Sequence, residues 1–291
     1  MMETIKKTEV LVAALPYIQR YEGKIFVIKY GGAAMVDDQL KASFAQDVTL
    51  LKKIGIQVVI VHGGGKEITD MAARLGISSH FVNGQRYTDD SMMEVVQMVL
   101  AGKTNKDIVA RINLNDGDAV GLCGIDASLL RVKKSTDGEA DLGLVGEITE
   151  VNTGYLHLLL NNNIMPIIAP IGVDERQQPY NINADVAAST IAASLKAEKL
   201  VFLSDVEGVL EEGKLIHSMT QEEASRLIGS RIISNGMIPK IKSAFEALNA
   251  GVNKVHLVDG RVTHSILLEI FTDEGIGTEL LPSLASLVNA G

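Results

Sequence analysis

Two short runs of mostly β-branched residues end abruptly in glycines, and this pattern constrains the fold more than any other feature of the chain. The first run is Ile25-Phe-Val-Ile-Lys-Tyr-Gly-Gly32, and the second is Gln57-Val-Val-Ile-Val-His-Gly-Gly-Gly65. Such a run predicts a buried parallel strand that opens into a ligand crevice. Glycine has no Cβ, so the backbone N–H groups of these turns can approach an anion closely. Two such turns predict a site for two ligands, at least one of them anionic.

The composition narrows the class of protein. The chain has 291 residues, of which 46% are hydrophobic, enough for one large α/β domain or two lobes around an aliphatic core. Its 27 basic and 36 acidic residues give a formal net charge of −9. This balance argues against nucleic acid as a partner, because phosphate backbones require basic patches. The single cysteine, Cys123, excludes an intrachain disulfide framework and is typical of a reducing cytosol.

The sequence gives no sign of a secretory signal or a membrane span. No long apolar segment follows the N-terminal Met1-Met-Glu-Thr-Ile-Lys-Lys7. The longest uncharged apolar stretches, such as 164–173, contain prolines and are much shorter than the ~20 residues that a membrane-spanning helix needs. We therefore expect a cytoplasmic protein with no membrane partner.

Strand and helix patterns alternate along almost the whole chain. This alternation predicts an α/β fold in which helices cover both faces of one mainly parallel sheet shared by two lobes. Ligands of such a sheet bind at the carboxyl ends of its strands, where the glycine turns lie. The expected strands are 24–30, 57–62, 119–123, 165–172, 199–204 and 253–258, with a hairpin of 129–134 and 144–151 about a turn at 136–138. The expected helices are 8–22, kinked at Pro16, then 38–54, 66–75, 91–102 with a possible extension to 113, 184–193, 220–229 and 239–250.

Two lysines and one aspartate stand beside turns of this predicted sheet. Lys29 precedes the first glycine turn, Lys240 follows Gly236-Met-Ile-Pro239, and Asp185 precedes an alanine-rich helix. Fixed cations of this kind suit phosphoryl transfer, in which the oxygens of the transferred group carry negative charge. From position alone the lysines could equally be solvated surface charges, and Asp185 could be a simple helix N-cap.

Other chemistries find less support. Gly102-Lys-Thr104 resembles the end of a P-loop, but Gln97 occupies the position of the required glycine. The turn that begins at His62 resembles a lipase oxyanion turn, but the chain has no G-x-S-x-G elbow, and neither glycine turn completes G-x-G-x-x-G. No group of His, Cys, Asp and Glu has zinc-ligand spacing, so the sequence predicts no metal site made by the protein alone.

Six motifs in order resemble the amino-acid-kinase family. They are Lys29-Tyr-Gly-Gly32, Val61-His-Gly-Gly-Gly65, Asn83-Gly-Gln-Arg86, Asn181-Ile-Asn-Ala-Asp185, Leu203-Ser-Asp-Val206 and Gly236-Met-Ile-Pro-Lys240. Any one of these motifs is weak, but the six together are specific. The resemblance as a whole runs from about residue 8 to residue 280. The resemblance implies a three-layer αβα sandwich around a mainly parallel open sheet, here with an extra N-terminal helix.

The same resemblance implies a reaction: Mg-ATP-dependent phosphorylation of the γ-carboxylate of N-acetyl-L-glutamate in arginine biosynthesis. Lys29 and Lys240 match the family's two lysines that stabilise the transferring phosphoryl group. Asp185 matches the aspartate that holds both lysines in place. The transfer is direct, and no general base is needed because the acceptor is already a carboxylate. The magnesium ion is implied to arrive with ATP rather than in a protein cage.

Binding residues follow from the same motifs. The family pattern implies that Gly64 and Gly65 face the reacting carboxylate of the substrate and that Arg86 binds the α-carboxylate of the substrate. Asn181 is implied to form a hydrogen bond to the substrate. The residues implied for the nucleotide are Gly31, Gly32, Ser204, Asp205, Val206, Gly208, Leu210 and Met237.

Two segments are similar to the arginine-inhibited branch of the family. Residues 1–22 resemble a helix that interlaces with a neighbouring subunit and links dimers into a hexameric ring, although a helix covering the chain's own sheet remains an alternative. The run 259–278 resembles the region that binds L-arginine, with Glu269 opposite the guanidinium and Lys199 and His256 nearby. The resemblance divides the rest of the chain into an amino-acid lobe, 23–195, and a nucleotide lobe, 196–291. It leaves open whether a PII-type nitrogen-signalling protein binds.

Two alternatives remain from the sequence. A kinase of the same fold could act on carbamate, glutamate, aspartate or a nucleoside monophosphate. A non-catalytic arginine sensor could also keep the fold, although Lys29, Asp185 and Lys240 would then have no evident use.

Overall fold

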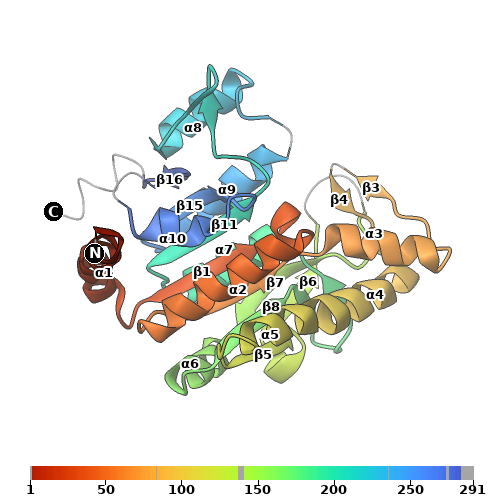
Figure 1. Cartoon of the computed structure of the whole chain (residues 1–291). Helices are drawn as coiled ribbons and strands as arrows, with labels where there is room; N and C mark the ends of the chain where they lie inside the picture. Colours follow the sequence, from red (N-terminus) through yellow and green to blue (C-terminus); the bar gives the residue numbers. More distant parts are fainter. Residues whose placement is uncertain (1, 83, 137–140, 235, 273–274, 283–291) are drawn as a thin grey trace.

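The computed structural model describes residues 2–82, 84–136, 141–234, 236–272 and 275–282, and Figure 1 shows how their elements are arranged. In chain order the helices are α1 (Met2–Tyr21), η1 (Gly32–Met35), α2 (Asp38–Lys53), α3 (Gly65–Arg74), α4 (Asp90–Val96), η2 (Gln97–Thr104), α5 (Asn105–Asn113), η3 (Asp126–Ser128), α6 (Thr153–Asn161), α7 (Ala184–Ser194), α8 (Gln221–Gly229), α9 (Met237–Asn249) and α10 (Ser265–Ile270). The strands are β1 (Ile25–Tyr30), β2 (Gln57–His62), β3 (Phe81–Val82), β4 (Gln85–Arg86), β5 (Ala119–Cys123), β6 (Leu130–Lys134), β7 (Gly146–Val151), β8 (Met165–Ala169), β9 (Ile171–Val173), β10 (Pro179–Asn181), β11 (Lys199–Ser204), β12 (Leu210–Glu211), β13 (Lys214–Leu215), β14 (Ser218–Met219), β15 (Lys254–Asp259) and β16 (Thr278–Leu280).

One eight-stranded sheet runs through both halves of the described chain, in the order β14-β16-β15-β11-β1-β2-β8-β5. Its pairs are parallel except for β15 with β16, which are antiparallel. The two glycine-ended strands are central neighbours, paired along their whole length from Ile25 with Gln57 to Tyr30 with His62. The predicted continuous and mainly parallel sheet is confirmed, and both glycine turns leave it at the same edge.

Helices cover both faces of this sheet, as a three-layer sandwich requires (Figure 1). Alternate residues of β1 divide between the two interfaces: Val27 packs in the cluster that includes residues of α7 and α9, and Ile28 in the one that includes residues of α2, α5 and α10. Both side chains are fully buried. The strands therefore read as continuous apolar runs, because each of their faces is covered.

A second sheet, ordered β10-β9-β6-β7, lies beside the carboxyl edge of the first. The expected hairpin is present as the antiparallel pair β6 and β7, but positions 137 and 138 of its expected turn lie outside the described residues. The prediction of a single strand over 165–172 is wrong. The chain breaks after Ala169 into β8 and β9, which belong to different sheets, because Pro170 cannot donate a ladder hydrogen bond.

The long helix expected after Asp89 is interrupted. Asp89 caps α4 by accepting from the backbone N–H of Met92. The next eight residues, η2, form a π-helix before the α-helical pattern resumes at Asn105. π-Helical turns are rare and often occur at functional sites. This one packs beside the second glycine turn.

The N-terminal helix α1 begins earlier than predicted, at Met2, and contains Pro16. Figure 1 places it at the periphery beside α10. Its last turns contact the body of the molecule, where Tyr17 meets Phe271 edge to face with ring centroids 6.0 Å apart. Val12 and Leu15 on the same helix are 64% and 49% exposed.

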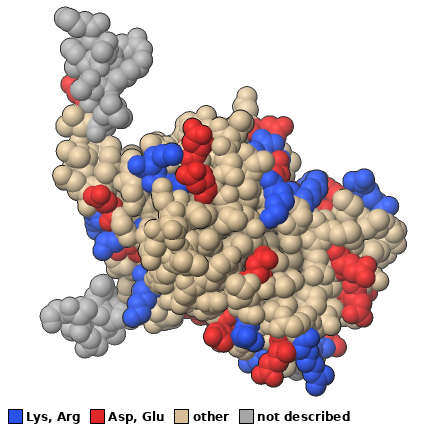
Figure 2. All heavy atoms as spheres, turned by 90° about the horizontal axis from the view of Figure 1, so that it is seen from below, with Lys and Arg blue, Asp and Glu red and all other residues tan. Residues whose placement is uncertain are grey.

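The described residues include no helix that is long and apolar enough to cross a membrane. Figure 2 shows acidic and basic side chains in mixed groups on the face that it displays. Ion pairs also join charges of opposite sign, as in the network of Asp38, Arg111 and Asp107.

Candidate active site

The structure brings the three predicted catalytic residues together. Lys29 stands near the end of β1, Asp185 in the first turn of α7 and Lys240 in the first turn of α9. Lys29 Nζ lies 3.1 Å from Asp185 Oδ1, and Lys240 Nζ lies 2.7 Å from Asp185 Oδ2. The three side chains are 13%, 20% and 11% exposed, so they are mostly buried but keep part of their surface accessible.

The electrostatics of this cluster favour an incoming anion. Burial alone would raise the pKa of Asp185, but the charges of Lys29 and Lys240 outweigh it and hold the pKa at about 2. Burial, and then the charge of Lys29, lower the pKa of Lys240, while Asp185 opposes both effects. One carboxylate shared by two ammonium groups leaves the cluster with excess positive charge.

Asp185 does not act as the N-cap of α7. That position belongs to Asn183, whose side chain accepts from the backbone N–H groups of Asp185 and Val186. Asp185 is therefore free to turn its carboxylate toward the lysines. The positive end of the helix dipole also favours a negative charge in this first turn.

The first glycine turn forms an anion cradle. Gly32 has φ of +69°, a conformation that favours glycine, and a Cβ at this position would collide with the carboxylate of Asp205. That carboxylate accepts a hydrogen bond from the backbone N–H of Ala33. The turn therefore presents a backbone N–H that binds an anionic oxygen.

The second glycine turn and Arg86 form one unit. Gly64 has φ of +155°, and Gly65 begins α3. Arg86, buried at the end of β4, donates from Nη2 to the Gly65 carbonyl (2.9 Å) and to Thr69 Oγ1 (2.8 Å), and from Nη1 to Ser79 Oγ (2.8 Å). These bonds hold the guanidinium at the turn. The guanidinium has five N–H donors, so some of them remain available to a ligand carboxylate. Thr69 and Ser79 were not predicted, because neither belongs to a motif.

The other predicted binding residues lie at the ends of strands and helices or in the loops between them. Asn181, at the end of β10, donates from Nδ2 to Thr88 Oγ1 at 3.3 Å. Ser204 ends β11, and Gly208 has φ of +142°, with Thr278 packed where a Cβ would stand. Val206 and Leu210 are 38% and 39% exposed and available to a ligand. Met237 begins α9. Positions 83 and 235 of the motifs lie outside the described residues.

The three residues expected near arginine also form a cluster, at the opposite edge of the sheet. Lys199 Nζ donates to His256 Nε2 at 2.9 Å, and His256 Nδ1 donates to Glu269 Oε1 at 2.6 Å. Glu269 Oε2 accepts from the backbone N–H groups of Ile276 (2.7 Å) and Gly277 (3.0 Å). All three side chains are buried. Burial lowers the pKa of His256, the hydrogen bond to Glu269 opposes this effect, and the charge of Lys199 adds to it. Because Nε2 accepts from Lys199, only Nδ1 carries a proton and the ring is neutral.

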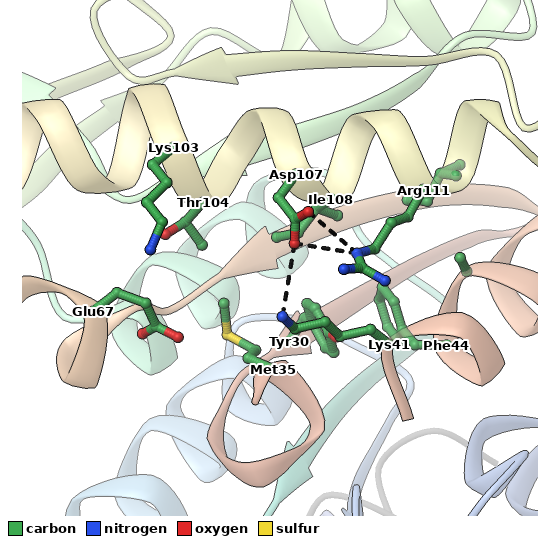
Figure 3. Close-up of a pocket in the computed structure, with 12 residues that line it drawn as sticks. Tyr30, Met35, Lys41, Phe44, Glu67, Lys103, Thr104, Asp107, Ile108 and Arg111 are labelled. Carbon is green, nitrogen blue, oxygen red and sulfur yellow. Dashed lines mark hydrogen bonds and ion pairs between the residues drawn. The ribbon is translucent and has the colours of Figure 1, made fainter. Parts of the chain in front are cut away.

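A separate cavity of about 260 Å³ lies on the α2 and α5 face (Figure 3). Tyr30 and Phe44 stack at its floor, with ring centroids 3.7 Å apart. Asp107 lies 3.9 Å from Lys41 and 3.2 Å from Arg111, and Asp38 lies 3.8 and 3.0 Å from the same two cations. Two carboxylates therefore balance two cations here. The cavity contains none of the predicted site residues.

No group of three or more His, Cys, Asp and Glu side chains able to hold a metal ion occurs in the described part of the chain. The donors near the anion cradle, such as Asp205, could at most supplement a cation that arrives with a polyphosphate.

The fold and this site together define a class of phosphoryl-transfer enzyme: a parallel sheet, two glycine turns at its carboxyl edge, and a carboxylate clamped by two lysines. The model of the amino acid kinase family matches residues 24–259. The chain belongs to this family.

Relatives with curated names share about half of the sequence. An acetylglutamate kinase from Chlorobaculum tepidum is 54% identical over 274 residues, covering 94% of this chain and 96% of that protein. An acetylglutamate kinase from Aquifex aeolicus is 53% identical over 295 residues, covering 96% and 99%. A solved structure of N-acetylglutamate synthase from Neisseria gonorrhoeae, complexed with coenzyme A and N-acetyl-glutamate, has a TM-score of 0.84 and 28% identity. That match covers 94% of this chain and 63% of the synthase, which is the longer protein. The same synthase has also been solved with coenzyme A and L-arginine, with a TM-score of 0.79 and 27% identity over 94% of this chain.

Proposed function

We propose that this chain transfers the γ-phosphoryl group of ATP to the γ-carboxylate of N-acetyl-L-glutamate, giving N-acetyl-L-glutamyl 5-phosphate. The observation that carries the proposal is the cluster of Lys29, Asp185 and Lys240 beside two glycine turns. The names of the relatives supply the substrate.

Each group has a defined task in this mechanism. The N–H groups of the first glycine turn and Lys29 hold the phosphates of ATP, whose magnesium ion offsets their charge. Arg86 holds the α-carboxylate of the amino acid, and the second glycine turn orients the reacting carboxylate. Lys240 and Lys29 stabilise the negative charge that spreads over the transferring group. Asp185 is a positioning residue, because it touches the lysines and keeps them apart.

The reaction needs no proton transfer from the acceptor. A carboxylate is already an anionic nucleophile at neutral pH, so the enzyme has only to bring two anions together and compensate their charge. The net positive charge of the cluster meets this requirement, since one carboxylate neutralises only one of the two lysines.

We also propose regulation and assembly. L-Arginine is the expected inhibitor, bound near Glu269, and the synthase solved with L-arginine supports this as a structural relative that binds it. The lobes 23–195 and 196–291 would bind the amino acid and the nucleotide. The exposed apolar side chains of α1 support its role as a contact between subunits in a hexamer.

ADP release tests these proposals. The full chain is assayed with Mg-ATP and N-acetyl-L-glutamate, with L-glutamate as the control substrate, and each reaction is run with and without millimolar L-arginine. Activity on the acetylated substrate alone, suppressed by arginine, is the expected result. Activity indifferent to arginine would retain the enzyme and remove the regulation. No turnover of either amino acid would overturn the proposed reaction.

A further inference from the structure

A polar contact network lies directly beneath the second glycine turn, on the side away from the catalytic lysines. His62 is the last residue of β2 and is fully buried. Its Nδ1 donates to the carbonyl of Gly63 at 2.8 Å. Its Nε2 accepts from Nδ2 of Asn105 at 3.1 Å. Both ring nitrogens are therefore in use, one at the turn and one at a helix.

Asn105 is placed by the π-helix. It is the first residue of α5, directly after η2, and it has no exposed surface. Its amide also donates to the carbonyl of Ile167 in β8 at 2.9 Å and lies 3.3 Å from the carbonyl of Leu122 in β5. One side chain thus spans the edges of three parallel strands. Figure 3 shows this helix from the cavity side, with the preceding Thr104 directed toward the cavity.

Two glycines make room for this arrangement. A Cβ on Gly121 would stand 1.9 Å from Asn105 Oδ1, so β5 can approach the amide only with glycine there. A Cβ on Gly64 would stand 2.6 Å from Leu100 Cδ2 of η2. The π-helix therefore packs against the turn itself as well as presenting Asn105 to His62.

The contact to the Gly63 carbonyl has a direct consequence for the cleft. The peptide between Gly63 and Gly64 is planar and trans, so its C=O and N–H point in opposite directions. With the carbonyl held by His62, the N–H of Gly64 must point the other way, away from the imidazole. In the proposed function that N–H faces the reacting carboxylate.

We propose that Asn105 and His62 form a positioning relay that fixes the Gly63–Gly64 peptide and so aims the Gly64 N–H at the acceptor carboxylate. This inference rests on the proposed function for the identity of the acceptor. Asn105 holds the ring orientation of His62, and His62 holds the peptide. Neither side chain needs to touch the substrate.

The protonation state agrees with this geometry. Burial lowers the pKa of His62 to about 4, and the nearby charge of Lys106 also lowers it, while the bond to Gly63 opposes the shift. The ring is therefore neutral near pH 7. A neutral imidazole has one donor and one acceptor, and the two partners observed fix the proton on Nδ1.

The test compares four variants with the wild-type chain. Asn105→Ala removes the amide that contacts His62. In His62→Gln the side-chain amide reaches the position of Nε2 and can accept from Asn105, but no donor remains near the Gly63 carbonyl. In His62→Asn the shorter amide reaches the position of Nδ1 and can donate to the Gly63 carbonyl, but no acceptor remains near Asn105. Asn113→Ala is the matched control, because Asn113 lies on the same helix and contacts the backbone of Ala119 in β5, at 3.0 and 2.6 Å, but has no bond to the turn. Kinetic constants for N-acetyl-L-glutamate and ATP are measured separately for each protein.

Loss of one such hydrogen bond at the turn should raise the KM for N-acetyl-L-glutamate about tenfold in Asn105→Ala and His62→Gln, with the KM for ATP changed less than about twofold. His62→Asn, which keeps a donor near the Gly63 carbonyl, should raise the KM for N-acetyl-L-glutamate much less than His62→Gln does. Asn113→Ala should leave both KM values near wild type. An unchanged KM in Asn105→Ala, or equal changes in both KM values, would overturn the relay.

A second readout does not depend on turnover. Nitrogen-15 NMR of the imidazole should show His62 as the neutral Nδ1–H form in the wild type and a mixture of tautomers in Asn105→Ala. A wild-type chain with this tautomer but no kinase activity would refute the proposed reaction and leave the contact network standing. A wild-type Nε2–H form would refute the relay whatever the activity.

Discussion

The two carboxylate clusters of this protein, at opposite edges of one sheet, use similar groups in different proportions. The active-site cluster sets one carboxylate, Asp185, between two lysines. The second cluster joins Lys199 to Glu269 through the neutral ring of His256. The first therefore carries excess positive charge, and the second is balanced.

The difference extends to the remaining hydrogen-bonding capacity of each carboxylate. Glu269 is satisfied by His256 and by two backbone N–H groups, and Gly275 lies so close that a Cβ there would stand 2.8 Å from its Oε2. Asp185 contacts the ammonium groups of Lys29 and Lys240, which carry one charge more than it neutralises. A cluster with unbalanced charge suits the binding of an anion, whereas a balanced and buried one suits structure, or a ligand that must first displace a contact.

The largest expected effect comes from removing one of the two active-site cations. Lys240→Ala should lower kcat by about 10²–10³, the range found when a charge-stabilising donor is lost from a transition state. The KM for N-acetyl-L-glutamate should change only a few-fold. Lys242→Ala, on the exposed side of the same helix, is the control in the ADP-release assay. A kcat near wild type in Lys240→Ala would show that the excess charge has no catalytic use.

A smaller effect on rate is expected from the carboxylate between the lysines. Asp185→Asn keeps the shape but leaves two ammonium groups in mutual repulsion, so kcat should fall about 10- to 100-fold through their misplacement. The free energy of unfolding should fall by about 3 kcal/mol, since a buried charge pair has lost its partner. Urea denaturation checks the second value. Full stability together with full activity would mean that Asp185 does not organise the cluster.

A substitution in the second cluster should change the inhibition by arginine rather than kcat. Glu269→Gln removes the charge that we expect to meet the guanidinium of arginine, so the arginine concentration for half-inhibition should rise about tenfold or more. The kcat without arginine should stay near wild type, and Glu246→Gln on the exposed face of α9 should behave as the wild type does. An unaltered inhibition curve in Glu269→Gln would place the arginine site elsewhere.

Much of the fold followed from local sequence. Strands β2 and β11 have the predicted bounds, 57–62 and 199–204. The apolar run of β2 ends at His62, directly before the glycine turn, and that of β11 ends at the polar Ser204. The cluster of Lys29, Asp185 and Lys240 could be anticipated because motifs at the carboxyl ends of parallel strands converge on one edge.

What could not be predicted depends on contacts between distant segments. The π-helix η2 has no sequence signature, so the segment was expected to continue as an α-helix. His62 was read only as part of a glycine turn, since its burial and its two partners come from η2, α5 and the adjoining strands. Strand β16 was missed because its three residues gain their structure from pairing with β15.

The smallest expected effect is a pH dependence of the free energy of unfolding, which arises from the burial of Lys199 in the second cluster. Burial, and then the charge of Lys254, lower the pKa of Lys199 to about 8. In the unfolded chain this lysine stays protonated to about pH 10, so folding above pH 8 releases a proton and the free energy of unfolding rises with pH.

Between pH 8 and 9.5 this contribution should amount to about 1–2 kcal/mol, and below pH 8 it should be constant. Lys199→Met cannot titrate, so urea denaturation should show a smaller rise for this variant than for the wild type. Lys196→Met, at an exposed position three residues earlier, should keep the wild-type slope. Identical slopes in the Lys199 variant and the wild type would mean that water reaches this ammonium group. The second cluster would then be as open to a ligand as the first, and the contrast between them would rest on charge balance alone.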